Sequence, residues 1–170
     1  MEVEFPMKSK VKRPIGLQLS KMLHDPRNLD LIRHLRADPR IAISALARKV
    51  KMSAPAVKER VQRLEEAGII QGYRLELDPA ALGLPITAII RVRPMPGQLA
   101  KIVKLAQSLP QVTECHRITG EDCFLVKIHL ESLDGLDRLL DRFLVFGQTT
   151  TSILQSSPVP LRTPPLPDER

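Results

Sequence analysis

The chain has 170 residues, of which 43% are hydrophobic and 26% charged, so it can bury a core and is not a wholly disordered protein. Its longest nearly apolar stretch, residues 82–90, is too short to cross a bilayer, and no apolar segment near the N-terminus predicts a signal peptide. Two cysteines outside any C-x-x-C pattern favour a reduced, cytoplasmic protein. Aromatic residues make up only 3% of the chain, which argues against a surface that stacks on nucleic-acid bases.

The net charge of +7 is concentrated in the first half of the chain. Residues 1–24 carry five Lys or Arg against two acids and are broken by Pro and Gly near their middle, which predicts a basic, flexible N-terminal arm. Residues 25–75 carry eleven basic against six acidic side chains, whereas residues 76–158 carry eight against nine. This division predicts a nucleic-acid-binding module followed by a module for a ligand or partner. The alternative is a solubilising tail followed by ordinary charged helix faces.

Residues 25–75 predict a helix-turn-helix domain of three short helices. Asp25 and Pro26 are an N-cap and a first helical residue, and the apolar spacing that follows ends near Asp38. A second short helix spans the apolar positions of residues 43–50. Ser53 then caps a third helix, which Gly68 ends. The tight turn between the second and third helices completes the motif.

The third helix turns Val57, Val61 and Leu64 inward and its polar side chains outward. A helix of this kind fits the major groove of DNA, and its free N-terminal amides can also hold a phosphate. The alternative is an amphipathic helix with an ordinary charged surface. The predicted DNA contacts are Ser44, Ser53, Ala54, Pro55, Lys58, Glu59, Arg60, Gln62 and Arg63.

After a linker at residues 76–83, residues 84–158 predict a second domain. Alternating residues give strands over 86–92, 112–119, 123–131 and 150–155, and apolar stripes give helices over 99–109 and 136–143, the latter closed by Gly147. The order βαββαβ is that of a ferredoxin-like fold, with one sheet face left uncovered. Ile89 and Leu125 lie on that face and suit a second copy of the chain. Residues 159–170, with four prolines, predict a loose tail.

The pattern in residues 28–83 resembles the N-terminal half of the Lrp/AsnC family of transcription regulators. Asn28 stands where that family usually has Asp, and Lys51 where a turn Gly is common. The resemblance implies an α+β protein with an N-terminal winged-type helix-turn-helix domain and a C-terminal ferredoxin-like domain that binds an effector and forms dimers or larger oligomers. The matching residues are Leu31, Ile32, Leu35, Asp38, Arg40, Leu46, Ala47, Ser53, Val57, Arg60, Val61, Leu64, Gly68, Ile69, Ile70, Gly72, Tyr73, Leu77, Asp78 and Gly83.

The resemblance extends over the second domain, where the segment 119–122 is similar to the family's small-molecule response loop. It implies that an amino acid binds between subunits. Asp122 suits an ammonium group, and the amides near Gly120 suit a carboxylate. The alternative is that Gly120 makes a hairpin turn that Asp122 caps. The candidate effector residues are Met95, Pro96, Gly97, Gln98, Thr119, Gly120, Glu121, Asp122, Thr150 and Thr151.

Enzyme motifs such as a P-loop, a nucleophile elbow or a zinc site are missing from the sequence, so we expect no cofactor and no catalytic residues. Siroheme decarboxylases are similar over both halves and form the enzyme alternative. Their His-Asn-x-x-Arg type of segment has no counterpart in this chain. Two further alternatives are an RNA-binding sheet, for which the strands have too few aromatic residues, and a partner protein that has lost DNA binding.

Overall fold

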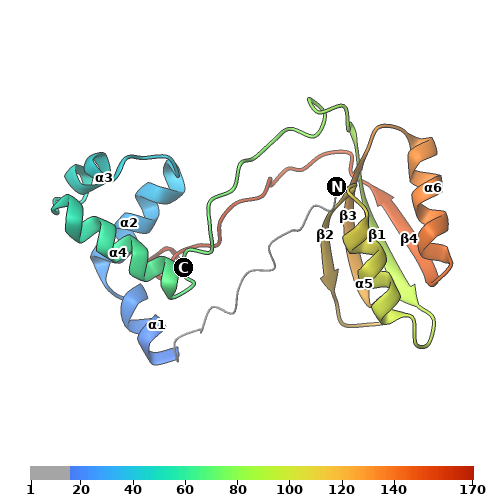
Figure 1. Cartoon of the computed structure of the whole chain (residues 1–170), viewed down its shortest axis with the longest axis horizontal. Coiled ribbons are helices and arrows are strands. Elements are labelled where there is room, and N and C mark those ends of the chain that lie inside the picture. Colours follow the sequence, from blue (N-terminus) through green and yellow to red (C-terminus); the bar gives the residue numbers. More distant parts are fainter. Residues whose placement is uncertain (1–15) are drawn as a thin grey trace. The chain divides into compact units, whose positions relative to one another are not determined.

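A computed structural model describes residues 16–170 of the chain. These residues form two compact units, one of residues up to Leu75 together with Leu161–Arg170, the other of Glu76–Pro160 (Figure 1). Among the described residues, no helix is both long and apolar enough to cross a membrane.

The first unit contains four α-helices: α1 (Gly16–Leu23), α2 (Pro26–Ala37), α3 (Ile43–Lys49) and α4 (Ala54–Glu66). Two predicted caps define the starts of α2 and α4. The Asp25 carboxylate accepts from the Arg27 N–H at 2.9 Å, and the Ser53 hydroxyl accepts from the Ala56 N–H at 3.4 Å. Each cap satisfies one amide that the helix itself leaves without a partner.

The core of the first unit joins α2, α3 and α4, because Leu31, Leu46 and Val57 are fully buried between them. Burial of each such side chain contributes roughly 1.5–3 kcal/mol. Lys51 lies in the turn between α3 and α4 with a φ of 52°, a left-handed conformation that glycine adopts more readily. The turn therefore holds a lysine in a conformation that glycine adopts more readily, at the position where the resemblance suggests glycine. This arrangement confirms the predicted helix-turn-helix.

Helix α1 is a correction to the prediction that residues 1–24 form a flexible arm. Residues 16–23 are helical, and the rest of that arm lies outside the described residues. The Asn28 side-chain amide donates to the carbonyl of Met22 at 2.9 Å and thereby caps the last turn of α1. The sequence pattern missed this helix because a contact with α2 holds it.

The C-terminal segment is a second correction, because the predicted loose tail packs on the first unit. Leu166 is only 9% exposed, and a short 3₁₀ helix, η1 (Pro167–Glu169), follows it. Asp168 pairs with Arg33, and Glu169 forms two hydrogen bonds with Arg36. The proline content suggested a loose chain, but these prolines precede and begin a docked turn.

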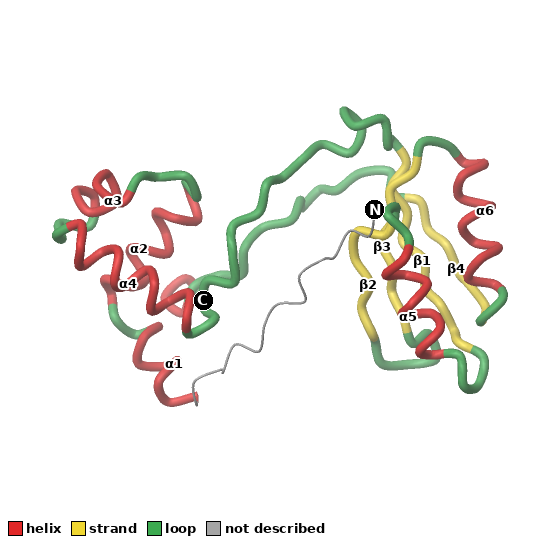
Figure 2. Tube along the Cα trace, viewed as in Figure 1, coloured by secondary structure: helices red, strands yellow, loops and turns green. Residues whose placement is uncertain are grey.

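The second unit is a four-stranded antiparallel sheet in the order β2-β3-β1-β4 with two helices (Figure 2). This topology confirms the ferredoxin-like fold. In chain order its elements are β1 (Ile86–Pro94), α5 (Leu99–Ser108), β2 (Val112–Arg117), β3 (Phe124–Leu130), α6 (Leu133–Leu144) and β4 (Gly147–Ile153).

Strand alternation separates a covered from an uncovered face of this sheet. Ile90 and Val126 are paired across β1 and β3, and both are fully buried in one core with Ile102 of α5 and Phe143 of α6. The neighbouring residues Ile89, Arg91, Leu125 and Lys127 point to the other face, because successive side chains alternate along a strand.

Gly147 begins β4 instead of closing α6, which ends at Leu144. A Cβ on Gly147 would overlap the Arg93 carbonyl and lie 2.9 Å from the Pro94 Cα atom. Its missing side chain therefore lets β4 approach the end of β1, and β4 starts three residues earlier than the sequence predicted.

Candidate DNA-binding and effector sites

Helix α4 presents a polar face to solvent. Ser53 at its N-cap, and then Pro55, Lys58, Glu59, Gln62 and Arg63, are exposed, as is Ser44 on α3. Ala54 differs from these, because it is half-buried against the core of the first unit. The first-turn amides of α4 and the Lys58 ammonium thus lie at the exposed end of the helix-turn-helix, where an anion can reach them.

Two pairs of side chains on α4 bond to each other along the helix. Arg63 pairs with Glu59, and Gln62 donates to Glu66 at 2.8 Å. These are i, i+4 pairs on an exposed surface, so each contributes only about 0.3–0.5 kcal/mol. Within residues 16–170 the Lys58 side chain makes no hydrogen bond or ion pair. Arg63 can therefore exchange Glu59 for another acceptor at small cost, and Lys58 has no partner to give up.

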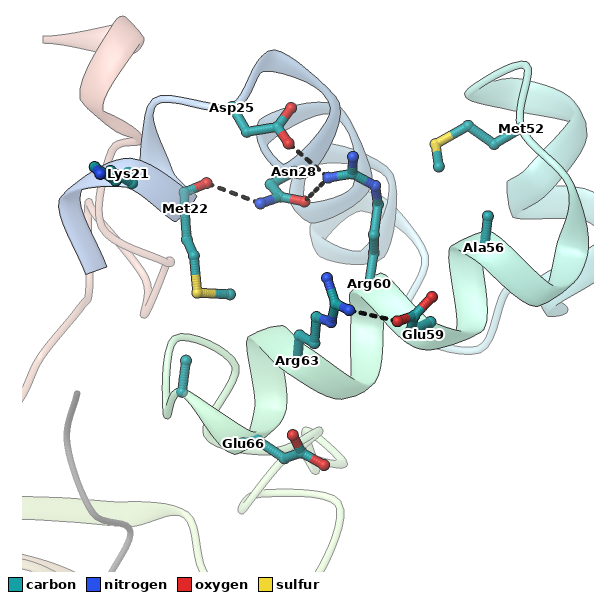
Figure 3. A pocket seen from close by; sticks show the side chains of 11 residues that line it. Lys21, Met22, Asp25, Asn28, Met52, Ala56, Glu59, Arg60, Arg63 and Glu66 are labelled. Carbon is teal, nitrogen blue, oxygen red and sulfur yellow. Dashed lines mark hydrogen bonds and ion pairs between the residues drawn. The ribbon is translucent and has the colours of Figure 1, made fainter. Parts of the chain in front are cut away.

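Arg60, one of the predicted DNA contacts, is already bonded within the first unit. Its guanidinium donates to Asp25 at 2.5 Å and to the Asn28 side-chain oxygen at 2.8 Å (Figure 3). The hydrogen bond from Arg60 lowers the pKa of Asp25 below its usual value. Arg60 therefore joins α4 to α2, and the sequence pattern, which placed it beside the apolar stripe, could not distinguish this internal role from a groove contact.

Beside this network is a hollow of about 760 Å³ between α1, α2 and α4. Figure 3 shows Met22 and Met52 at its edge and Arg63, Glu59 and Glu66 along α4. Acidic and basic side chains alternate around it, so its lining does not select a ligand of one charge.

Sequence reasoning missed three basic side chains next to the turn of the motif. Arg48, Lys49 and Lys51 are all exposed at the end of α3 and in the turn before α4. Within the described residues they make no ion pair. The signal in the sequence was the excess of basic residues in 25–75, to which these three belong. Together with Lys58 they give the helix-turn-helix a positive surface suited to phosphates.

The predicted response loop lies at the turn between β2 and β3, where it contacts two arginines of β1. Gly120 has a φ of 109°, which favours glycine. Asp122 lies 3.6 Å from Arg91 and 3.9 Å from Arg93, and Glu121 also pairs with Arg93. Sequence reasoning did not assign Arg91 and Arg93 to this site. Their alternation on the uncovered face of β1 was the available signal.

The remaining candidate effector residues divide between two faces. Thr150 pairs with Arg91 across β1 and β4 and shares its face, whereas Thr151 pairs with Ile90 on the covered face. Met95 and Gly97 are exposed in the turn before α5, where Gly97 has a φ of 77°. Pro96 is exposed in the same turn. Gln98 Oε1 and Thr151 Oγ1 are buried without a hydrogen-bond partner. Asp122 of the loop 119–122 and Thr150 of β4 thus both neighbour Arg91, the first through an ion pair and the second through strand pairing, whereas Thr151 lies on the other face.

Titratable side chains in residues 16–170 form no group of three or more that could hold a metal ion. His116 pairs with Glu114, and His129 bonds to Thr87 at 2.9 Å, both on the sheet.

Comparison with known proteins assigns a family to both units. The family described as winged helix-turn-helix DNA-binding matches residues 24–71, and the Lrp/AsnC ligand binding domain matches residues 87–164. The HTH-type transcriptional regulator LrpC of Bacillus subtilis is 36% identical over 132 residues, which cover 78% of this chain and 92% of LrpC. The chain belongs to the Lrp/AsnC family. A further member, LrpA of Mycobacterium tuberculosis, is 31% identical over 134 residues, which cover 78% of this chain and 87% of LrpA.

Solved structures of Lrp/AsnC proteins are similar to this one. The structure of B. subtilis LrpC has a TM-score of 0.74 at 35% identity and covers 78% of this chain and 95% of LrpC. The feast or famine regulatory protein of M. tuberculosis, complexed with L-methionine, has a TM-score of 0.77 at 29% identity and covers 84% of this chain and 99% of its own. These relatives are named as regulators, which gives no support to the decarboxylase alternative.

Proposed function

We propose that this Lrp/AsnC protein is a one-component transcription regulator, which binds DNA through α4 and responds to an amino acid through its second unit. The observation that carries the proposal is the exposed polar face of α4, with Ser53, Lys58 and Gln62 outside a packed helix-turn-helix. The names of the relatives as transcriptional regulators support it. Arg48, Lys49 and Lys51 supply contacts to phosphates, and α4 reads base edges in the major groove.

Selection of bound sequences from a random DNA pool, with the full chain at near-physiological salt, tests the DNA-binding part. We expect enrichment of a near-palindromic site with half-sites about one helical turn apart. Binding without enrichment, which vanishes as salt rises, would leave only nonspecific attraction and would overturn the proposal.

The effector site we propose consists of Asp122, in the turn between β2 and β3, and of Arg91 and Arg93 on β1. An amino acid offers an ammonium group to Asp122 and a carboxylate to an arginine, and the present Asp122–Arg91 and Asp122–Arg93 pairs hold those charges near each other at 3.6 and 3.9 Å. The L-methionine complex of the M. tuberculosis relative supports the choice of an amino acid.

Substitution Asp122→Asn tests this site. We expect loss of calorimetric binding to whichever member of a panel of the twenty amino acids, L-methionine included, binds the unaltered chain. The fold should remain, because these ion pairs lie at the surface with Asp122 partly exposed, and surface pairs contribute only about 0–1 kcal/mol. Asp137→Asn, at an exposed position of α6, is the matched control. Unchanged binding in Asp122→Asn would exclude this carboxylate from the effector site.

We also propose that two chains pair through the uncovered sheet face. Ile89 and Leu125 are half-buried apolar side chains in the middle of that face. Two-fold pairing through such a patch leaves each helix-turn-helix available for one half-site.

A further inference from the structure

The C-terminal segment Leu161–Arg170 contacts α2 through Asp168 and Glu169, near its end. The Arg36 guanidinium donates to both oxygens of Glu169, at 2.6 and 2.8 Å, in a bidentate arrangement. Arg33 pairs with Asp168 and lies 4.0 Å from Glu169. A bidentate arginine–carboxylate pair fixes geometry as well as charge, so two neighbouring acids of the segment are matched to two arginines one helical turn apart.

The segment is also organised internally for this contact. The Leu166 N–H donates to Glu169 Oε2 at 2.9 Å, and the Glu169 N–H donates to the Leu166 carbonyl at 3.0 Å. These bonds close η1 and orient Glu169 toward Arg36. The hydrogen bond with Arg36 lowers the pKa of Glu169 to about 2, so the carboxylate stays ionised at any physiological pH. Leu166, 9% exposed, adds an apolar anchor.

The docked segment means that two stretches of chain join the two units. The first lies between α4 and β1, and the second between β4 and Leu166. The second stretch, residues 154–165, can extend over at most about 40 Å. Four of its residues are prolines, which favour an extended and semi-rigid chain. Residues 165–170 lie beyond the part that the Lrp/AsnC ligand binding domain matches.

We propose that residues 161–170 are a strap: docked on α2, they tie the end of β4 to the DNA-binding unit and limit the orientations that unit can take. Among the described residues, the ion pairs of the strap are with α2 and none is with the exposed face of α4, so the strap leaves the proposed groove-reading side chains accessible. Its effect on DNA binding rests on the proposed function and on the dimer proposed above, whereas its docking does not.

Amide hydrogen exchange of residues 166–170 in the full chain, followed by mass spectrometry, tests the docking, because the Glu169 N–H donates to the Leu166 carbonyl in the docked turn. We expect exchange to be severalfold slower than in a synthetic peptide of residues 155–170, and Asp168→Asn combined with Glu169→Gln to abolish that protection. Arg36→Glu alone should also abolish it, because this change removes the partner of Glu169 and leaves the residues of η1 unaltered. Glu131→Gln, at an exposed position of the second unit, is the control. Exchange at the peptide's rate in the unaltered chain, or protection that disappears on dilution, would overturn the proposal.

Removal of residues 161–170 tests the limit on orientation. We expect weaker binding to a DNA site with two half-sites and unchanged binding to a single half-site, because a tether acts only when both DNA-binding units must engage at once. Equal affinities of the shortened and full chains for the double site would contradict the strap's role. A full chain that binds no DNA would instead refute the proposed function and leave the hydrogen-exchange result on docking unaffected.

Discussion

At the scale of single residues, Asn28 illustrates how one amide connects three helices. It accepts from Arg60 of α4 and donates to the Met22 carbonyl of α1, and it is 5% exposed (Figure 3). The usual family residue at this position, Asp, can accept but cannot donate. The departure from the family pattern is therefore accompanied by a helix, α1, that an aspartate would not cap in this way.

Asn28→Asp should loosen α1 and lower the free energy of unfolding by about 1–3 kcal/mol, because the Met22 carbonyl loses its donor and faces a carboxylate oxygen. Thermal unfolding and amide hydrogen exchange of residues 16–23 measure this. Gln107→Glu, the same change at an exposed position of α5, serves as the control. Equal exchange of α1 in the two variants would show that the Asn28 amide does not hold the helix.

At the scale of elements, α4 has one buried apolar side and one exposed side whose residues make few contacts with the rest of the first unit. Val57 and Leu64 are fully buried, while Lys58 between them is exposed. A lysine here can be removed without disturbing the core, so its contribution to DNA binding can be measured separately from folding.

Lys58→Ala should weaken DNA binding and reduce the slope of log affinity against log salt by about 1, because a protein that neutralises one phosphate fewer releases about one counterion fewer on binding. Binding measured across a salt series tests this. Lys104→Ala, an exposed lysine of α5, should leave the slope unchanged. A slope in Lys58→Ala equal to that of the unaltered chain would remove Lys58 from the residues that bind phosphate.

The stability of the second unit should depend on pH through His129, a residue of its sheet. Burial and the nearby Lys127 lower the pKa of His129 from 6.5, while Glu114 opposes this. The unfolded chain then binds a proton more readily than the folded one, so stability is complete above pH 6.5 and falls as the pH drops below it. Unfolding midpoints from pH 7.5 to 5.5 should decrease less in His129→Gln than in the unaltered chain or in His34→Gln. Identical pH profiles would assign the dependence to other groups.

At the scale of the whole molecule, the two units differ in charge and in surface: the first carries the basic excess, and the second has the uncovered sheet face. Residues 25–75 carry the basic excess, and residues 76–158 carry almost none. The second unit is therefore free of the electrostatic penalty that two basic surfaces would impose on pairing.

Leu125→Glu should convert dimers to monomers in sedimentation velocity, because one carboxylate from each chain would be buried in the proposed interface. Leu144→Glu, at an exposed apolar position of α6, should leave the mass unchanged. If both variants sediment as the unaltered chain does, the sheet face is not the interface.

The elements that the sequence predicted well are those with local signals. Asp25 and Ser53 are caps, and strand alternation around Ile89 and Leu125 determines the faces of the sheet. Helix α1 and the docked C-terminus escaped prediction because contacts with α2 hold them, from Asn28 to Met22 and from Arg36 to Glu169. The candidate DNA-binding site likewise has residues that local spacing predicts and residues whose contacts depend on the tertiary structure. Lys58 could be placed from helical spacing, whereas the internal role of Arg60 depended on where Asp25 and Asn28 lie in space.

The close approach at Gly147 has a consequence for engineering. No side chain fits there without moving the backbone of Arg93 and Pro94, because even a Cβ would lie 2.9 Å from the Pro94 Cα atom. The close pairing of Gly147 with Pro94 fixes where β4 starts and where the turn with Met95 and Gly97 follows β1. Gene libraries built to change the specificity of the proposed effector site should therefore vary the turns and keep the glycine codon constant.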